Sequence, residues 1–184
     1  MAAIACIFHL LVFWIALGDA KNFFKFEDCT RQDGIAQVNR FEINPDPIDL
    51  RGDMNVTMNV NVLRDVPLEA KLRTRYYRLH KVFGVTVDIP IPCLLGKFGS
   101  CTLPLCEYLK VFRPQVAPFL PNGEDQECPL EAGEYGGEDV PVEIPDMTMV
   151  ARWIMKGKYR TELKLIDVND GSELACYKIW VQIR

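Results

Sequence analysis

The stretch of residues 85–106, VTVDIPIPCLLGKFGSCTLPLC, combines the strongest constraints on the fold. It opens on an alternating apolar run, at Val85, Val87, Ile89 and Ile91. This alternation is the period of a β-strand. Pro90 and Pro92 then form a rigid corner, because proline lacks a backbone donor, and three of the seven cysteines follow. The stretch is therefore a hinge of the molecule, and the rest of the chain decides whether it serves catalysis or binding.

The first twenty residues have the pattern of a secretory signal peptide. The apolar run at residues 4–17 is too short to span a bilayer, and Gly18 and Ala20 are small residues at the positions that a signal peptidase reads. We expect cleavage after Ala20. The remaining residues 21–184 are enough to bury one core, so we expect a single domain in the secretory pathway.

The predicted mature chain holds six cysteines, an even number that favours three disulfides in an oxidising compartment. Zinc is the competing interpretation, but there is no Cys-x-x-Cys pair, and the only mature histidine, His80, is far from every cysteine in sequence. We expect no metal and no cofactor. The six residues are Cys29, Cys93, Cys101, Cys106, Cys128 and Cys176.

The net charge and an N-glycosylation tripeptide predict two properties of the protein surface. The net charge is -4 with both signs interspersed, which lacks the footprint of a nucleic-acid binder, so we expect no nucleic-acid partner. Asn55-Val56-Thr57 predicts N-glycosylation at Asn55 and a surface position there.

Turn signals separate about eight strand-like segments, which predicts an all-β sandwich or cup of antiparallel strands. The clearest strand is 54–62, where apolar and polar residues alternate as in a half-buried strand. Helical spacing occurs only at 103–112, which predicts one short helix, and 113–137 is predicted to be a long loop tied down by Cys128. The other predicted strands are 22–28, 40–43, 72–82, 85–91, 140–144, 159–166 and 173–183.

Catalytic residues are not apparent. An enzyme needs a nucleophile with a base, a carboxylate pair or a metal cluster. His80 is the only mature histidine, there is no Gly-x-Ser-x-Gly motif, and the predicted disulfides occupy every mature thiol. We therefore expect no catalytic residue and no enzymatic activity, although a carboxylate-only hydrolase stays open because Asp and Glu are plentiful.

Two charged features each have two interpretations. The basic run at 71–81 either attracts anionic lipid headgroups, at about 1 kcal/mol per cation, or is the solvated face of an edge strand. Arg51-Gly52-Asp53 is either an integrin-recognition tripeptide or a turn built around Gly52.

Large apolar side chains also crowd into predicted loops and strand ends. One cluster surrounds Val82, Phe83 and Val85, and a second is Trp153-Ile154-Met155. Core packing is the ordinary explanation. We favour the alternative that they line the rim of a lipid-binding cup, where they contact acyl chains and a bilayer surface.

Several short motifs follow one another in a fixed order along the mature chain. They are Asn-Pro-Asp-Pro-Ile (44–48), Gly-x-x-Asn-Val-Thr (52–57), Ile-Pro-Cys (91–93), Gly-Ser-Cys-Thr (99–102), Ile-Pro-Asp (144–146) and Gly-x-Tyr-Arg (157–160). Together with the first cysteine after an aromatic run and Trp153, this order resembles the MD-2-related lipid-recognition (ML) domain family, and within it the ganglioside-activator branch.

The resemblance implies a β-cup with a large apolar cavity for one lipid, and no catalysis. It also implies the pairs Cys29–Cys176, Cys93–Cys101 and Cys106–Cys128, of which the first closes a very long loop and stabilises the fold by about 4 to 5 kcal/mol in the chain-entropy model. The lipid-binding residues at the mouth would be Val82, Phe83, Val85, Trp153, Ile154, Met155 and Tyr159.

In function, the resemblance implies a secreted or lysosomal protein that extracts a glycolipid (a glycosphingolipid) or a phospholipid from a membrane surface and has a glycosidase partner. The branch carries a fourth bridge in the loop before the residue that matches Cys128, and this chain lacks both cysteines of it. Residues 113–127 are therefore expected to be looser. The alternative is an extracellular signalling or adhesion protein on the same fold.

Overall fold

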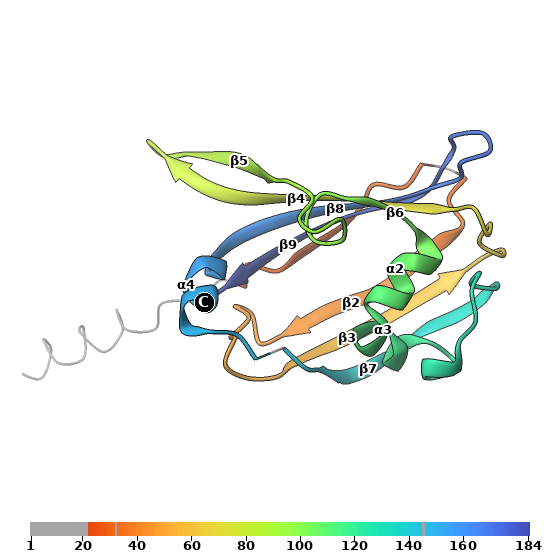
Figure 1. Ribbon diagram of the computed structural model, residues 1–184, viewed down its shortest axis with the longest axis horizontal. Helices are drawn as coiled ribbons and strands as arrows, with labels where there is room; N and C mark the ends of the chain where they lie inside the picture. Colours follow the sequence, from red (N-terminus) through yellow and green to blue (C-terminus); the bar gives the residue numbers. More distant parts are fainter. Residues whose placement is uncertain (1–21, 32, 145) are drawn as a thin grey trace, which may run out of the picture.

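The computed structural model describes residues 22–31, 33–144 and 146–184, and the predicted signal peptide lies outside this range. Two antiparallel sheets face each other (Figure 1), which confirms the predicted all-β sandwich. The large sheet has the order β1-β9-β8-β4-β5, with β6 also paired to β4. Its strands are β1 (Lys25–Asp28), β4 (Lys71–Val82), β5 (Val85–Ile91), β6 (Thr102–Pro104), β8 (Gly157–Ile166) and β9 (Glu173–Ile183). The small sheet, ordered β2-β3-β7, consists of β2 (Ala36–Asn44), β3 (Met54–Val62) and β7 (Gly133–Val142).

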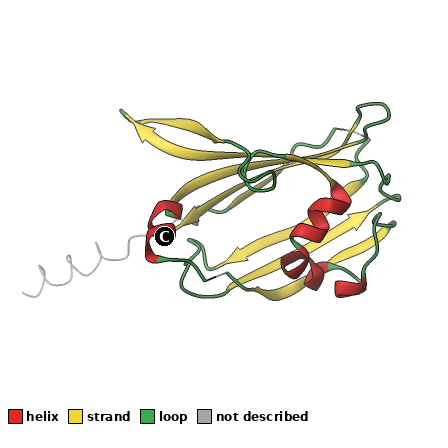
Figure 2. Cartoon of the chain, in the orientation of Figure 1, coloured by secondary structure: helices red, strands yellow, loops and turns green. Residues whose placement is uncertain are grey.

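The helical segments differ from the prediction of a single helix (Figure 2). The helix expected at 103–112 is present as α2, but two further α-helices occur among the described residues, so that prediction is wrong in number. The segment expected to be a long loop contains α3, η1 and η2, and its last residues belong to β7. The segments are α2 (Leu105–Val111), α3 (Arg113–Val116), η1 (Ala117–Phe119), η2 (Gly123–Asp125) and α4 (Met149–Met155).

Two of these differences have a physical cause. α4 is seven residues long, which is about two turns and too short for a helical period to stand out in the sequence, and none of its residues is buried. Thr148 Oγ1 caps it by accepting from Ala151 N at 3.2 Å. The start of β7 is rich in glycine, which is depleted in strands. Gly136 is required there, because a Cβ at this position, with φ of 142°, would collide with the carbonyl oxygen of Met58 on β3.

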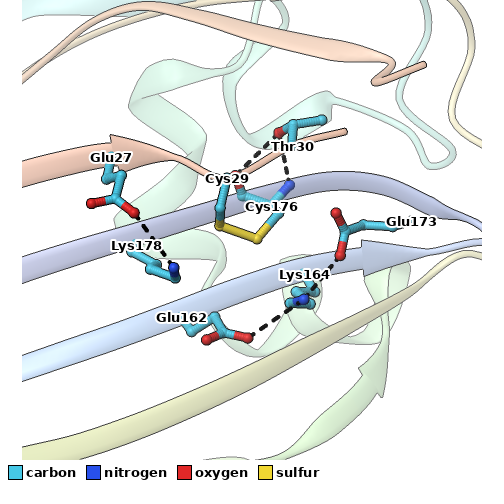
Figure 3. Close-up of polar contacts among 8 residues, drawn as sticks. All are labelled: Glu27, Cys29, Thr30, Glu162, Lys164, Glu173, Cys176 and Lys178. Carbon is cyan, nitrogen blue, oxygen red and sulfur yellow. Dashed lines mark hydrogen bonds and ion pairs between the residues drawn. A yellow bond between two sulfur atoms is a disulfide. The ribbon is translucent and has the colours of Figure 1, made fainter. Parts of the chain in front are cut away.

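The outer face of the large sheet is charged (Figure 3). Glu27 of β1 pairs with Lys178 of β9 at 3.4 Å, and Lys164 of β8 reaches the carboxylates of Glu162 and Glu173 at 3.7 and 2.9 Å. Such partly exposed pairs contribute little stability. They mark the solvent face, and the alternating residues of the same strands therefore face the second sheet.

The three predicted disulfides are confirmed. Cys29–Cys176 joins the end of β1 to β9, beside Thr30, whose hydroxyl donates to Cys176 O and accepts from Cys176 N (Figure 3). Cys93–Cys101 closes the loop between β5 and β6, and Cys106–Cys128 ties α2 to the segment before β7.

The hydrophobic core is concentrated at one end of the sandwich, which we call the packed end. Its buried residues lie where β3 ends and where β2, β4, α2, β7 and β9 begin. The opposite end carries the tip of the β4–β5 hairpin and α4, and we call it the open end (Figure 1). The core residues are Ile35, Val62, Val66, Ala70, Leu105, Tyr135 and Leu174.

Candidate functional site

A cavity of about 380 Å³ lies between the two sheets, next to the core. Its walls come from β3 on the small sheet, from β4, β8 and β9 on the large sheet, and from α2, α3 and η1 along one side. The lining is almost wholly apolar. Contributions include Val56, Met58 and Val60 from the small sheet, Leu72, Leu163 and Leu165 from the large sheet, and Leu109 and Val116 from the helices.

The two tyrosine hydroxyls at the cavity already donate hydrogen bonds to backbone carbonyls. Tyr177 donates its hydroxyl to Ala36 O and Tyr135 donates to Glu131 O, both at 2.8 Å. Burial raises the pKa of Tyr177 to about 12. Gln115 is the one side-chain amide among the lining residues. An interior of this kind offers an occupant dispersion contacts and almost no directed hydrogen bonds, which suits a hydrocarbon chain.

Aromatic rings fill the edge of the sandwich between β1 and β2. The Phe26 ring lies 5.5 Å from both Phe41 and Tyr177, and the Phe24 ring lies 5.7 Å from Phe41. Phe41 and Tyr177 also line the cavity. The opposite edge is covered by α2 and α3 (Figure 1). The cavity is therefore walled on both edges and at the packed end.

None of the residues predicted to bind lipid lines this cavity; they gather instead at the open end. Val82, Phe83 and Val85 form the tip of the β4–β5 hairpin. Phe83 is fully exposed and Val85 is 65% exposed. Trp153, Ile154 and Met155 lie on α4 and are also exposed.

The hairpin extends the inner face of the large sheet beyond the cavity. Leu72 lines the cavity, and two-residue steps along β4 place Tyr76, His80 and Val82 on the same face. Their partners across the ladder are apolar residues of β5: Ile91 lies opposite Tyr76, Val87 opposite His80 and Val85 opposite Val82. Ile89 lies between Ile91 and Val87 on the same face of β5. Val87 and Ile89 are nearly half exposed. An apolar strip therefore runs along β5 toward the tip, beside Arg78 and His80 of β4.

The hairpin tip holds a large side chain in an unfavourable backbone conformation. Val82 pairs with Val85, so Phe83 and Gly84 form a two-residue turn, with φ of 48° and 84°. Turns with both angles positive favour Asn-Gly, because a larger side chain at the first position is strained. The same arrangement recurs at Leu95-Gly96, with φ of 52° and 71°, and Leu95 is 85% exposed. Both turns present an apolar side chain to solvent.

Tyr159 and Arg78 hold α4 at the open end. Both lie on the inner face of the large sheet, opposite each other in the β4–β8 ladder. Tyr159 donates its hydroxyl to Met155 O at 2.9 Å, and Arg78 donates from Nη2 to Lys156 O at 2.8 Å. The last turn of α4 is thereby fixed over the inner face. Tyr159 supports α4 rather than the cavity wall.

The glycosylation and adhesion predictions stay predictions. Asn55 lies within β3 and donates from Nδ2 to Asp139 Oδ1 at 3.0 Å. Arg51 is paired with Asp49 at 2.9 Å, which lowers the pKa of that carboxyl to about 2, and Gly52 N donates to Asp49 O, so the tripeptide lies in a turn. The basic run does not lie on an edge strand, because β4 pairs with β8 on one side and with β5 and β6 on the other. Its Lys71, Arg73 and Arg75 are exposed to solvent, and attraction of anionic headgroups by this run stays a prediction.

Sequence reasoning missed the residues that line the cavity. The signal was present in β3, where the alternation that predicted the strand marks Val56, Met58, Val60 and Val62 as inward-facing, and all four line the cavity. In the described ranges, no group of three His, Cys, Asp or Glu side chains is placed to hold a metal ion. No helix of this part of the chain is long and apolar enough to cross a membrane.

Comparisons with known proteins relate the sequence of this chain to one family. Residues 23–183 match the sequence profile of the ML domain. A ganglioside GM2 activator from Macaca fascicularis is 27% identical over 166 residues, covering 88% of this chain and 83% of the relative. The one from Mus musculus is 26% identical over the same length, covering 88% and 82%. Among solved structures, a Niemann-Pick type C2 protein from the Japanese carpenter ant aligns with a TM-score of 0.43 at 16% identity, covering 87% of this chain and 99% of that one.

Proposed function

The chain belongs to the ML-domain family, and from this premise we propose that it is a non-enzymatic lipid-binding and lipid-transfer protein. The observation that carries the proposal is the cavity of about 380 Å³ between the sheets, lined almost wholly by apolar side chains. This volume falls within the usual range for ligand pockets, of roughly 300 to 1,000 Å³. Its chemistry suits the acyl chain of a lipid.

The energy of chain burial is large enough for extraction from a membrane. Each CH₂ group removed from water contributes about 0.8 kcal/mol. A cavity that shields about ten such groups from water would contribute about 8 kcal/mol of binding free energy, which is comparable to the free energy of burying the same groups in a bilayer. Exchange between protein and membrane is then close to balanced, as transfer requires.

Contact with a membrane is proposed to occur through the open end. Phe83, Val85, Trp153 and Ile154 are all more than half exposed there. A soluble protein rarely exposes a concentration of large apolar residues without a partner. A lipid surface is a partner that would bury them, and it would bring the inner face of the β4–β5 hairpin next to the acyl chains.

The substrate class and the partner are proposed from the relatives. Two of them are named as activators for ganglioside GM2. We propose that this chain extracts a glycolipid or phospholipid and presents it to a hydrolase, in the lysosome or outside the cell. Residues 113–127, where the branch has its fourth bridge, are held here by Arg113, which donates from Nη1 to the carbonyls of Glu124 and Gln126 at 2.6 and 3.0 Å. A docking surface in this region therefore does not depend on the absent bridge.

Obstruction of the cavity tests the proposal. Val60→Phe adds a ring at a half-buried lining position, whereas Val168→Phe makes the same change in the exposed β8–β9 loop. Uptake of a lipid with a fluorescent acyl chain should fall in the first variant and stay unchanged in the second. Circular dichroism and thermal unfolding establish that both are folded. Equal uptake by a folded Val60→Phe variant would refute the assignment of the acyl chain to this cavity.

A further inference from the structure

We infer that a basic pocket at the open end binds the anionic headgroup, a phosphate or carboxylate, of a lipid whose chain lies in the cavity. This inference rests on the proposed function and adds to it a preference for anionic lipids. The pocket has a volume of about 370 Å³ and lies between α4, the end of β9 and the segment before β3. Four of its seven lining residues are cationic: Arg51, Arg152, Lys156 and Arg184.

The fold brings these cations together from three separate segments. Met149, Arg152, Trp153 and Lys156 are spaced so that they share one face of α4 and its C-terminal cap. The chain around residue 48 is fixed along the end of β9, because Ile48 N donates to Gln182 O at 2.8 Å and Arg184 N donates to Ile48 O at 3.0 Å. This places Arg184 and Arg51 opposite that face of α4.

The positive charge of the pocket is only partly neutralised by its neighbours. Asp49 is the carboxylate paired with Arg51, and the guanidinium keeps the pKa of Asp49 low, so it contributes one negative charge. Within the described residues, Arg152, Lys156 and Arg184 form no ion pair with a carboxylate. Arg152 donates from Nε to Met147 O at 3.0 Å, which holds its guanidinium in place. Positioned guanidinium groups suit phosphate and carboxylate oxygens.

Exposed apolar side chains next to these cations favour a lipid over a soluble anion. Trp153 is 74% exposed and Met149 is 85% exposed, and both line the pocket. A hydrated inorganic anion gains nothing from these surfaces. An amphiphile buries them beside its charge, and tryptophan is enriched at the boundary between headgroups and acyl chains. Because α4 is fixed over the inner face of the sheet by Arg78 and Tyr159, the pocket lies at the end where the acyl chain would enter.

The test compares two lipids that differ only in headgroup charge, phosphatidylglycerol and phosphatidylcholine, with the same fluorescent acyl chains. The variant Lys156→Gln with Arg184→Gln removes two charges from side chains that form no ion pair with a carboxylate in the described residues. Its control, Arg31→Gln with Lys110→Gln, removes one arginine and one lysine charge from exposed positions after β1 and on α2, outside the pocket and outside the basic run at 71–81. Inorganic phosphate alone is measured in a separate binding experiment.

We expect the wild type to bind the anionic lipid more tightly. The pocket variant should lose about 30-fold in affinity for phosphatidylglycerol and keep its affinity for phosphatidylcholine, while the control changes neither. An equal loss in the control would assign the effect to general charge and overturn the inference, as would a retained preference in the pocket variant. Binding of inorganic phosphate as tight as that of the lipid would make the pocket a free-anion site and also overturn it. If the wild type bound neither lipid, the proposed function itself would fail, which is a distinct result.

Discussion

The turn at Phe83-Gly84 leads to a prediction in which stability and function change in opposite directions. Phe83→Asn places at φ of 48° a residue that tolerates this conformation, and it removes a fully exposed side chain. Relief of the strain should stabilise the fold by about 1 kcal/mol, the lower end of the cost of left-handed backbone for an ordinary residue. For a domain of this size, the midpoint of thermal unfolding should rise by about 2 to 4 °C.

The same substitution should weaken membrane binding. Burial of a phenylalanine side chain contributes about 1.5 to 3 kcal/mol, so removal of Phe83 should lower the affinity for vesicles by about 10- to 100-fold. Co-sedimentation with vesicles and differential scanning calorimetry measure the two effects on one sample. Leu63→Asn is the matched control, since Leu63 is a 56% exposed apolar residue just after β3, at the packed end. Unchanged vesicle binding by Phe83→Asn, or an equal loss with Leu63→Asn, would refute the assignment of the hairpin tip as a membrane contact.

Four further predictions follow from single features. Leu95→Asn should also raise the unfolding midpoint, because Leu95 has φ of 52°, and a lowered midpoint in calorimetry would contradict the strain argument. The difference in tyrosinate absorbance between wild type and Tyr177→Phe should show a midpoint near pH 12, and a midpoint near pH 10 would contradict the burial of this side chain. Because the pKa of Tyr177 is raised in the folded protein, the contribution of this side chain to stability is complete below about pH 10 and is lost as the pH rises toward 12. Replacing Cys29 and Cys176 by serine should lower the free energy of unfolding in urea by about 5 kcal/mol, and replacing Cys93 and Cys101 should lower it by about 2.5 kcal/mol. The difference follows from the loops that the bridges close, of 147 and 8 residues, and the reverse order would contradict the chain-entropy account. Arg113→Ala should increase proteolysis within 113–127 relative to Lys110→Ala, because it leaves two carbonyls without their donor, and equal cleavage would contradict its role.

The strands were predictable where alternation was strict. The predicted strands 54–62, 85–91 and 173–183 coincide with β3, β5 and β9. In β3 the alternation records the face that packs inward, whereas β5 keeps the alternation although all its residues except Ile91 are exposed. β6 was missed because it is three residues long. The start of β7 was missed because Gly136 is required by the close approach of Met58, and a glycine-rich sequence predicts a loop.

The site was only partly predictable. Phe83 and Trp153 stand out in the sequence because they belong to apolar clusters at predicted loops and strand ends, and this identified the open end. The basic pocket could not be predicted from the sequence, because Arg51, Arg152 and Arg184 come from three distant segments that only the fold brings together. The role of Tyr159 was equally hidden, since it depends on the carbonyl of Met155 at the end of an unpredicted helix.

The central claim is that the cavity between the sheets holds the acyl chain of a lipid. Native mass spectrometry of the protein purified from a secreting cell, followed by lipid extraction, tests it most directly. We predict one lipid per chain in the wild type and its loss in the folded Val60→Phe variant. Recovery of no lipid from the wild type, together with no uptake of a fluorescent lipid, would contradict the claim.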